Sequence, residues 1–235
     1  MLFRNKRYLE TLPTEHELGT AFPDYRPTYR TRTARINENH ALYDACATQG
    51  ELIDIGIEGW LRRADALKLY ELAYRARGDI LELGFYHGLA TSVLSQANHD
   101  SGLSKDVFSL EVWCEHVETA HSHLRARAIA DRVHLICEDA VGYIDRAAAD
   151  SRSFSLVFVD HSHAYQDVYD VCVRLETVVR RGGFCLFHDF NDARNTGPAA
   201  DYGVYHAVRD GLAASFRFYG VFGCAALYKR ARWPL

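Results

Sequence analysis

Apolar and polar positions alternate in a regular way along most of this chain. Short apolar runs rich in Val, Ile, Leu and Phe recur between longer segments in which apolar residues return every three or four positions. The first pattern predicts buried strands and the second predicts amphipathic helices. The predicted strands are 79–83, 107–110, 133–136, 155–159 and 184–187, and the predicted helices between them are 89–97, 115–129, 141–149 and 165–179.

This order of elements determines the expected fold class. Five strands separated by helices imply right-handed crossovers and a mostly parallel sheet with helices on both faces. After a further helix expected over 204–214, apolar runs at 216–219 and 225–228 have the spacing of a hairpin. We therefore predict a doubly wound α/β fold with a mostly parallel seven-stranded sheet and an antiparallel last strand.

The chain ahead of the first strand divides into two parts. Residues 1–38 are predicted to form an N-terminal arm, because residues 1–35 carry a net charge of +3 and three of the five prolines, which break long helices. Helices are expected over 40–49 and 58–77, so the main domain is assigned to residues 39–235.

Composition and charge narrow the class of protein. An apolar content of 48% is that of an ordinary globular domain. The formal net charge of −4, without a long basic run, argues against a nucleic-acid partner. No apolar run approaches the roughly 20 residues of a membrane helix, and charges occupy the place of a signal peptide's apolar stretch. A soluble cytoplasmic protein is predicted, without membrane contact and with a homo-oligomer left open.

The six cysteines carry no local motif. Cys46, Cys114, Cys137, Cys172, Cys185 and Cys224 are scattered, without a Cys-x-x-Cys pair and without a spacing typical of zinc ligands. A reduced thiol in an apolar segment behaves as a small apolar side chain. All six are therefore predicted to be free and buried.

Candidate chemistry gathers where the predicted strands end, since open α/β sheets bind ligands beyond the carboxyl ends of their strands. The first strand runs into Glu-Leu-Gly-Phe-Tyr-His-Gly (82–88), where Gly84 permits a tight turn and Gly88 lets a helix start close to the strand. A dinucleotide fingerprint and a phosphate loop both need glycines that are missing here. Glu111 ends the second strand and Asp139 follows the third, so both carboxylates are suited to accept hydrogen bonds from a nucleoside.

These strand ends resemble those of class I S-adenosylmethionine-dependent methyltransferases, over residues 55–229. Two further segments resemble small-molecule enzymes of the catechol and macrolide-sugar O-methyltransferase type. They are Asp-His-Ser-His-Ala-Tyr (160–165) after the fourth strand and Phe-His-Asp (187–189) at the end of the fifth. The resemblance implies a Rossmann-like fold, S-adenosyl-L-methionine as cofactor, and methyl transfer to a hydroxyl of a small-molecule substrate such as a natural product.

The resemblance also implies roles for individual residues. The cofactor's methionine end is expected against Glu82, Gly84, Tyr86, Gly88 and Thr91, its ribose against Glu111, and its adenine against Trp113, Asp139 and Ala140. In the similar enzymes the ends of the fourth and fifth strands supply carboxylates to a divalent metal, which points to Asp160 and Asp189 here.

Two ways of removing the acceptor's proton remain open. Asp160 and Asp189 offer the oxygen ligands that Mg²⁺ prefers, and Mg²⁺ or another divalent cation would lower the pKa of a bound hydroxyl. Alternatively His163 or His188, each at a strand end beside these carboxylates, acts as a general base without a metal. Two other functions are alternatives: non-methylating chemistry on the same fold, and a non-catalytic binding subunit.

Overall fold

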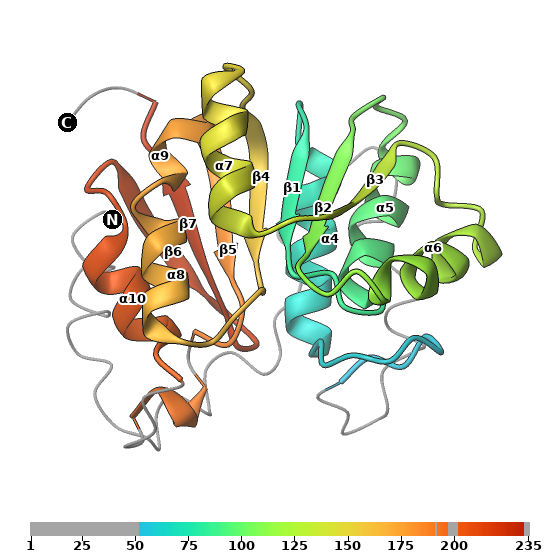
Figure 1. Ribbon diagram of the computed structural model, residues 1–235, viewed down its shortest axis with the longest axis horizontal. Coiled ribbons are helices and arrows are strands. Elements are labelled where there is room, and N and C mark those ends of the chain that lie inside the picture. The colour runs from blue at the N-terminus through green and yellow to red at the C-terminus, as the bar shows by residue number, and fades with distance from the viewer. Residues whose placement is uncertain (1–51, 191, 197–201, 233–235) are drawn as a thin grey trace.

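The computed structural model describes residues 52–190, 192–196 and 202–232 (Figure 1). The predicted arm over 1–38, the helix expected over 40–49 and Cys46 lie outside the described residues. The division of the chain at residue 39 therefore stays a prediction.

A seven-stranded sheet runs through the middle of the molecule (Figure 1). Its strands are β1 (Ile80–Leu83), β2 (Val107–Glu111), β3 (Val133–Cys137), β4 (Phe154–Val159), β5 (Val179–Phe187), β6 (Phe216–Phe222) and β7 (Ala225–Arg230). They lie in the order β3-β2-β1-β4-β5-β7-β6. Strands β1 to β5 pair in parallel, whereas β7 is antiparallel to both β5 and β6. The predicted fold class and the antiparallel last strand are confirmed.

Helices cover both faces of this sheet. They are α4 (Arg63–Arg75), α5 (Leu89–Ser101), α6 (His116–Ala126), α7 (Ala140–Ala149), α8 (Tyr165–Cys172), α9 (Leu175–Val178), the 3₁₀ helix η2 (Ala193–Thr196) and α10 (Val204–Gly211). One apolar core contains α4 and α5, and a second contains α7, α8, α9 and α10. Among the described residues, no helix combines the length and the apolar character needed to cross a bilayer.

Strand β4 separates the two cores. All of its residues are buried, with Leu156 and Phe158 in the core of α4 and α5, and Val157 and Val159 in the other core. Successive side chains of a strand point to opposite faces, so a strand covered on both sides requires a nearly continuous apolar run, which only Ser155 interrupts here.

Strand β5 is longer than its apolar pattern predicts. It includes Gly182 and Gly183, which the sequence pattern placed between a helix and a strand, and its pairing with β4 shifts register between Phe154 and Leu156. Gly182 has a φ of +78°, a conformation that glycine adopts without steric cost. The two glycines therefore form an irregularity inside the strand, where the pattern predicted a break.

Helix α4 begins later than its pattern predicts, and Asp65 sets the start. Its carboxylate accepts a hydrogen bond from the N–H of Arg62 at 3.1 Å in a capping box. The same carboxylate accepts hydrogen bonds from the N–H groups of Cys224 (2.9 Å) and Ala225 (3.0 Å), in the turn between β6 and β7. Asp65 thus attaches the final hairpin to the first described helix.

Candidate functional site

Two adjoining cavities open at the carboxyl ends of the parallel strands. The smaller has a volume of about 290 Å³ and the larger of about 610 Å³. Gly84, Glu111 and His161 line both of them. This is the edge at which open α/β sheets bind their ligands.

A carboxylate is held in a fixed orientation where the two cavities meet. Glu111 accepts hydrogen bonds at Oε1 from the N–H groups of Val112 (2.9 Å) and Trp113 (3.2 Å), and at Oε2 from the N–H of Tyr86 (3.0 Å). Three backbone donors therefore orient this side chain before any ligand arrives.

Two of the three residues predicted to contact adenine lie together. Asp139 and Ala140 line the smaller cavity at the start of α7, where the Asp139 carboxylate caps the helix by accepting a hydrogen bond from the N–H of Gly142 at 2.8 Å. Trp113 lines the larger cavity instead and is 61% exposed.

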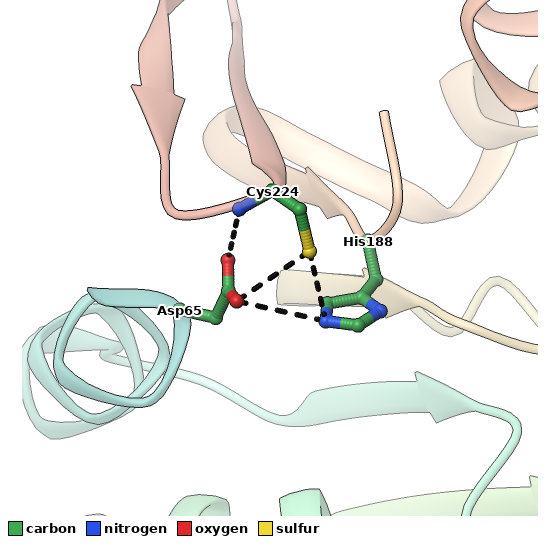
Figure 2. A group of neighbouring side chains, drawn as sticks. All are labelled: Asp65, His188 and Cys224. Atoms are coloured by element: carbon green, nitrogen blue, oxygen red, sulfur yellow. Dashed lines mark hydrogen bonds and ion pairs between the residues drawn. The ribbon is translucent and has the colours of Figure 1, made fainter. Parts of the chain in front are cut away.

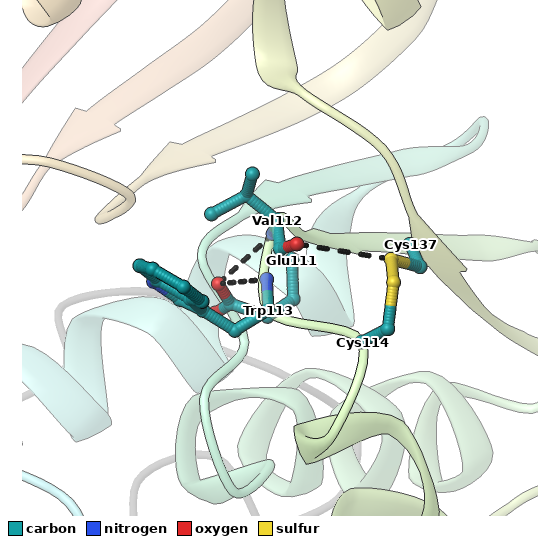
Figure 3. The surroundings of a disulfide bond; sticks show 5 residues. All are labelled: Glu111, Val112, Trp113, Cys114 and Cys137. Atoms are coloured by element: carbon teal, nitrogen blue, oxygen red, sulfur yellow. Dashed lines mark hydrogen bonds between the residues drawn. A yellow bond between two sulfur atoms is a disulfide. The ribbon is translucent and has the colours of Figure 1, made fainter.

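The prediction that all six cysteines are free and buried is wrong for two of them. Cys114, after β2, and Cys137, at the end of β3, are exposed and form a disulfide, with their Cα atoms 5.2 Å apart (Figure 3). Parallel pairing brings the two strand ends together, which scattered positions in the sequence do not reveal. Cys172, Cys185 and Cys224 are free and buried, as predicted. Because disulfides persist mainly in oxidising compartments, the cytoplasmic location stays a prediction.

The turn between β1 and α5 has an unusual backbone. Gly84, Tyr86 and Gly88 have φ values of +89°, +46° and +89°. A Cβ atom at Gly84 would lie 2.2 Å from the backbone oxygen of Asp160, and one at Gly88 would lie 3.1 Å from the Cβ of Ala120 in α6. Gly84 therefore lets the turns after β1 and β4 touch through their backbones, and Gly88 lets α5 approach α6.

Glu82 and Thr91 lie beneath this turn and line neither cavity. The Glu82 carboxyl accepts hydrogen bonds at Oε2 from the hydroxyls of Thr91 (2.6 Å) and Ser109 (2.5 Å). Its Oε1 is buried without a hydrogen-bond partner among the described residues. Burial raises the pKa of Glu82 to about 8. The carboxyl group is therefore mostly protonated at neutral pH in the folded protein.

This shifted pKa predicts a pH dependence of stability. Between the ordinary value of 4.5 and the raised value of about 8, the folded protein holds a proton that the unfolded chain has released, so the free energy of unfolding falls as the pH rises. Glu82→Gln removes this contribution. We expect the free energy of unfolding of the wild type to fall relative to E82Q by up to about 1.4 kcal/mol per pH unit across that window. Denaturant titrations at a series of pH values test this, and parallel curves for the two proteins would contradict it.

The larger cavity brings together the four residues predicted for acid–base or metal chemistry. His163 Nε2 lies 2.9 Å from Asp189 Oδ2. His188 Nδ1 lies 3.1 Å from Asp160 Oδ1 and 3.4 Å from Asp189 Oδ2. Val159 and Phe187 are paired at the ends of β4 and β5, so the segments that follow them are neighbours.

The two histidines have different environments. The side chain of His163 is 43% exposed and that of His188 is 4% exposed. The Nε2 of His188 faces Cys224 Sγ at 3.3 Å and Asp65 Oδ2 at 3.7 Å, so protein groups surround both of its ring nitrogens. Of these two histidines, His163 is the one that presents an accessible imidazole to the cavity.

The charges of the two carboxylates, Asp160 and Asp189, are offset by the histidines beside them. Burial disfavours the charged form of His188, but the Asp160 carboxylate, helped by Asp189, outweighs it and holds the pKa of His188 well above its ordinary value. Although burial also opposes the ionised form of Asp189, the two histidines lower the pKa of its carboxyl. The charged imidazole of His188 therefore relieves the repulsion between the two carboxylates.

Two residues after β5, Asn195 and Tyr202, support side chains and backbone that line this cavity. The sequence pointed to Tyr202 or Tyr205 near the acceptor, and it did not point to Asn195. Asn195 in η2 donates a hydrogen bond to the backbone oxygen of Asp189 (2.9 Å) and accepts one from the N–H of Tyr205 (2.8 Å). The ring of Tyr202 stacks on His163, with the ring centroids 4.7 Å apart. These contacts join segments on either side of a loop, and no periodic pattern marks them.

Comparison with known proteins connects this geometry to a family. Residues 81–190 match the family model described as a methyltransferase domain. The O-methyltransferase TomG from Streptomyces achromogenes, involved in tomaymycin synthesis and solved with S-adenosylmethionine, is similar at a TM-score of 0.58 and 20% identity, over 82% of this chain and 90% of that one. No curated protein matches the sequence.

Two other solved structures are similar in the same way. An O-methyltransferase from Bacillus cereus, in complex with S-adenosylhomocysteine, has a TM-score of 0.58 at 16% identity, over 87% of this chain and 93% of that one. A methyltransferase from Geobacter sulfurreducens has a TM-score of 0.54 at 18% identity, over 98% of this chain and 97% of that one. The matched family region runs from β1 to just after β5 and contains the whole lining of the smaller cavity and part of that of the larger one. Residues 81–190 thus match a methyltransferase domain, and the chain has the fold of methyltransferases solved with S-adenosylmethionine or S-adenosylhomocysteine.

Proposed function

We propose that this methyltransferase transfers the methyl group of S-adenosyl-L-methionine to a hydroxyl of a small molecule, such as a natural product. The observation that carries the proposal is the junction of the two cavities. A pocket with nucleoside-binding character meets, at Gly84, a larger cavity whose wall holds an imidazole–carboxylate pair. The O-methyltransferases among the similar structures support the choice of oxygen as acceptor.

The residues present fit the cofactor. The Glu111 carboxylate is oriented by three N–H groups and keeps lone pairs for ribose hydroxyls. At Gly84 there is no room for a Cβ, so the backbone itself forms the wall where the cavities meet. The bound cofactor supplies a methyl group already activated on a sulfonium. The chain's task is to align the acceptor oxygen with that methyl group. Such positioning lowers the activation free energy by roughly 7–11 kcal/mol.

His163 is the general base in this proposal. Its Nε2 is engaged by Asp189 at 2.9 Å, which orients the ring and leaves Nδ1 to accept the acceptor's proton. Stacking on Tyr202 further restricts the ring. His188 is less suited, because both of its nitrogens face protein groups. Asp189 is a positioning residue in this arrangement.

A metal-assisted reaction is the second candidate, and one observation favours it. Asp160, His163 and Asp189 each offer a ligand atom, all within 4.8 Å of one another. Two carboxylate oxygens suit Mg²⁺, although imidazole suits softer cations better. A divalent cation held there would lower the pKa of the acceptor hydroxyl, replacing the base.

One set of measurements tests both candidates. Calorimetry with S-adenosylmethionine and with NAD should show binding of the first alone. A screen of hydroxylated metabolites and of amines, with labelled methyl donor, should give an O-methylated product. Turnover that survives exhaustive chelation supports His163 as base, and turnover abolished by chelation and restored by Mg²⁺ or Mn²⁺ supports the metal. Cofactor binding without transfer to any acceptor would favour a binding subunit.

Glu111→Ala should weaken the binding of S-adenosylmethionine. Removing the carboxylate leaves polar partners unpaired, which costs about 1–3 kcal/mol. Titration calorimetry measures the change directly. Asp167→Ala is a matched control, since Asp167 also lines the smaller cavity but holds the hydroxyl of Ser162 at 2.7 Å. An unchanged affinity in E111A would exclude Glu111 as the ribose ligand.

A further inference from the structure

Beneath the larger cavity lies a second group of side chains that the proposed methyl transfer does not use (Figure 2). Asp65 comes from α4, His188 follows β5, and Cys224 lies in the turn between β6 and β7. They are 0%, 5% and 2% exposed. His188 and Cys224 also line the larger cavity, so the group is within reach of a small ion from solvent.

The three ligand-type atoms are spaced like the corners of a metal-coordination tetrahedron. Cys224 Sγ lies 3.3 Å from His188 Nε2 and 3.5 Å from Asp65 Oδ2, and the last two atoms are 3.7 Å apart. Zinc bonds of about 2.0–2.3 Å at tetrahedral angles separate pairs of ligand atoms by about 3.3–3.6 Å. A single ion can therefore contact all three with little movement.

Neighbouring groups hold each ligand in the orientation that a metal requires. His188 Nδ1 forms an ion pair with Asp160 Oδ1 at 3.1 Å, and the carboxylate favours a proton on Nδ1, which leaves Nε2 to bind a metal. Asp65 Oδ1 accepts hydrogen bonds from two backbone N–H groups of the hairpin, which turns Oδ2 toward the sulfur. Oδ2 accepts one hydrogen bond, from the N–H of Arg62 at 3.1 Å, and keeps a lone pair for a metal. A Cβ at Gly223 would lie 2.5 Å from Asp65 Oδ1, so glycine there permits this approach.

The chemistry of the donors favours a metal over a nucleophilic thiol. Cys224 Sγ lies near two carboxylates, 3.5 Å from Asp65 Oδ2 and 3.6 Å from Asp189 Oδ1. Reactive thiolates occur in electropositive surroundings, whereas these donors all gain from a cation placed among them. A thiolate and an imidazole select softer cations such as zinc over Mg²⁺.

We propose that Asp65, His188 and Cys224 bind Zn²⁺ through Oδ2, Nε2 and Sγ, with the fourth position open to the larger cavity. Binding releases two protons to solvent, the thiol proton of Cys224 and the Nε2 proton of the charged His188 ring. The ligands come from three distant segments, which is why the sequence shows no zinc-ligand spacing. This site shares no ligand with the group Asp160, His163 and Asp189. His188 lies between the two, with Nε2 facing the proposed zinc site and Nδ1 facing Asp160.

The full chain, loaded with Zn²⁺ and dialysed, should retain one equivalent of zinc by elemental analysis. The Co²⁺-loaded chain should show a thiolate-to-cobalt charge-transfer band. Cys224→Ser should abolish that band and lower zinc affinity by more than about 100-fold, since losing a ligand exceeds the roughly 10–100-fold cost of losing a ligand's supporting partner. Asp160→Asn removes the supporting partner of His188. This variant should weaken zinc binding by only about 10–100-fold and should keep the thiolate band.

Cys172→Ala is the matched control, because Cys172 is also a buried free thiol but lies in α8. It should keep both the zinc and the cobalt band. A wild-type chain that retains no zinc overturns the proposal. The proposal is also overturned if bound Co²⁺ gives a spectrum without a thiolate band and this spectrum disappears in Asp189→Asn. The ion would then be held by the carboxylates of the larger cavity. The wild-type spectra decide the question even where a variant fails to fold.

Discussion

His163→Ala should lower kcat for methyl transfer by roughly 10²–10⁴-fold, the range expected for a lost general base. The affinity for S-adenosylmethionine should change little, because His163 lines the larger cavity and not the smaller one. The fold should also persist, since the side chain is 43% exposed. Steady-state kinetics and titration calorimetry on the same preparation separate these quantities.

A second imidazole–carboxylate pair provides the control for this variant. His134 Nε2 lies 3.2 Å from Asp106 Oδ1, and neither residue lines either of the two described cavities, so His134→Ala should leave kcat unchanged. Asp189→Asn should reproduce much of the loss, and the double variant should lose less than the product of the two effects, because the residues act as a unit. Wild-type kcat in H163A would remove His163 from the mechanism.

Gly84→Ala should destabilise the protein by about 2–5 kcal/mol, combining left-handed backbone strain with steric overlap. The added Cβ would lie 2.2 Å from the backbone oxygen of Asp160 and 2.6 Å from the Cα of His161. Neither of these backbone atoms can rotate away as a flexible side chain could. The turns after β1 and β4 must therefore separate, which should also weaken cofactor binding at the junction of the cavities.

Gly102→Ala separates the two contributions. Gly102 has a φ of +66° at the end of α5, and no atom lies within 4 Å of the position of its Cβ. This variant should show only the backbone strain, about 1–2 kcal/mol. Denaturant titrations of both variants measure the difference, and equal losses would show that the contact between the two turns tolerates a Cβ.

The sequence predicts the fold well where each element has a single apolar period. Strand β4 is covered on both faces and therefore appears as an apolar run interrupted only by Ser155, while helices such as α8 bury one face. The full length of β5 could not be predicted, because the sequence Gly182-Gly183 is compatible both with a loop and with an irregular strand. The extent of β5 depends on its pairing with β4, and the local sequence does not reveal that pairing.

The candidate site was predictable only in part, for the same reason. Residues that directly follow strands, such as Glu111 and Asp160, could be placed because strand ends meet at one edge of the sheet. Asp65 and Cys224 could not, since a helix start and a hairpin turn come together only in the folded chain. The burial of Glu82 and Thr91 beneath the turn also depends on packing, which a motif does not report.

Because of the disulfide between Cys114 and Cys137, the centre and the β3 edge of the sheet are stabilised against unfolding in different ways. Strand β3 lies at the edge, is paired only with β2 and is partly exposed, whereas β4 is buried throughout. The cross-link spans 23 positions and encloses α6. Closing a segment of that length restricts the unfolded chain, by about 3 kcal/mol in the chain-entropy account. The centre of the sheet is thus stabilised by packing. The β3 edge, next to the smaller cavity, is stabilised because the disulfide lowers the conformational entropy of the unfolded chain.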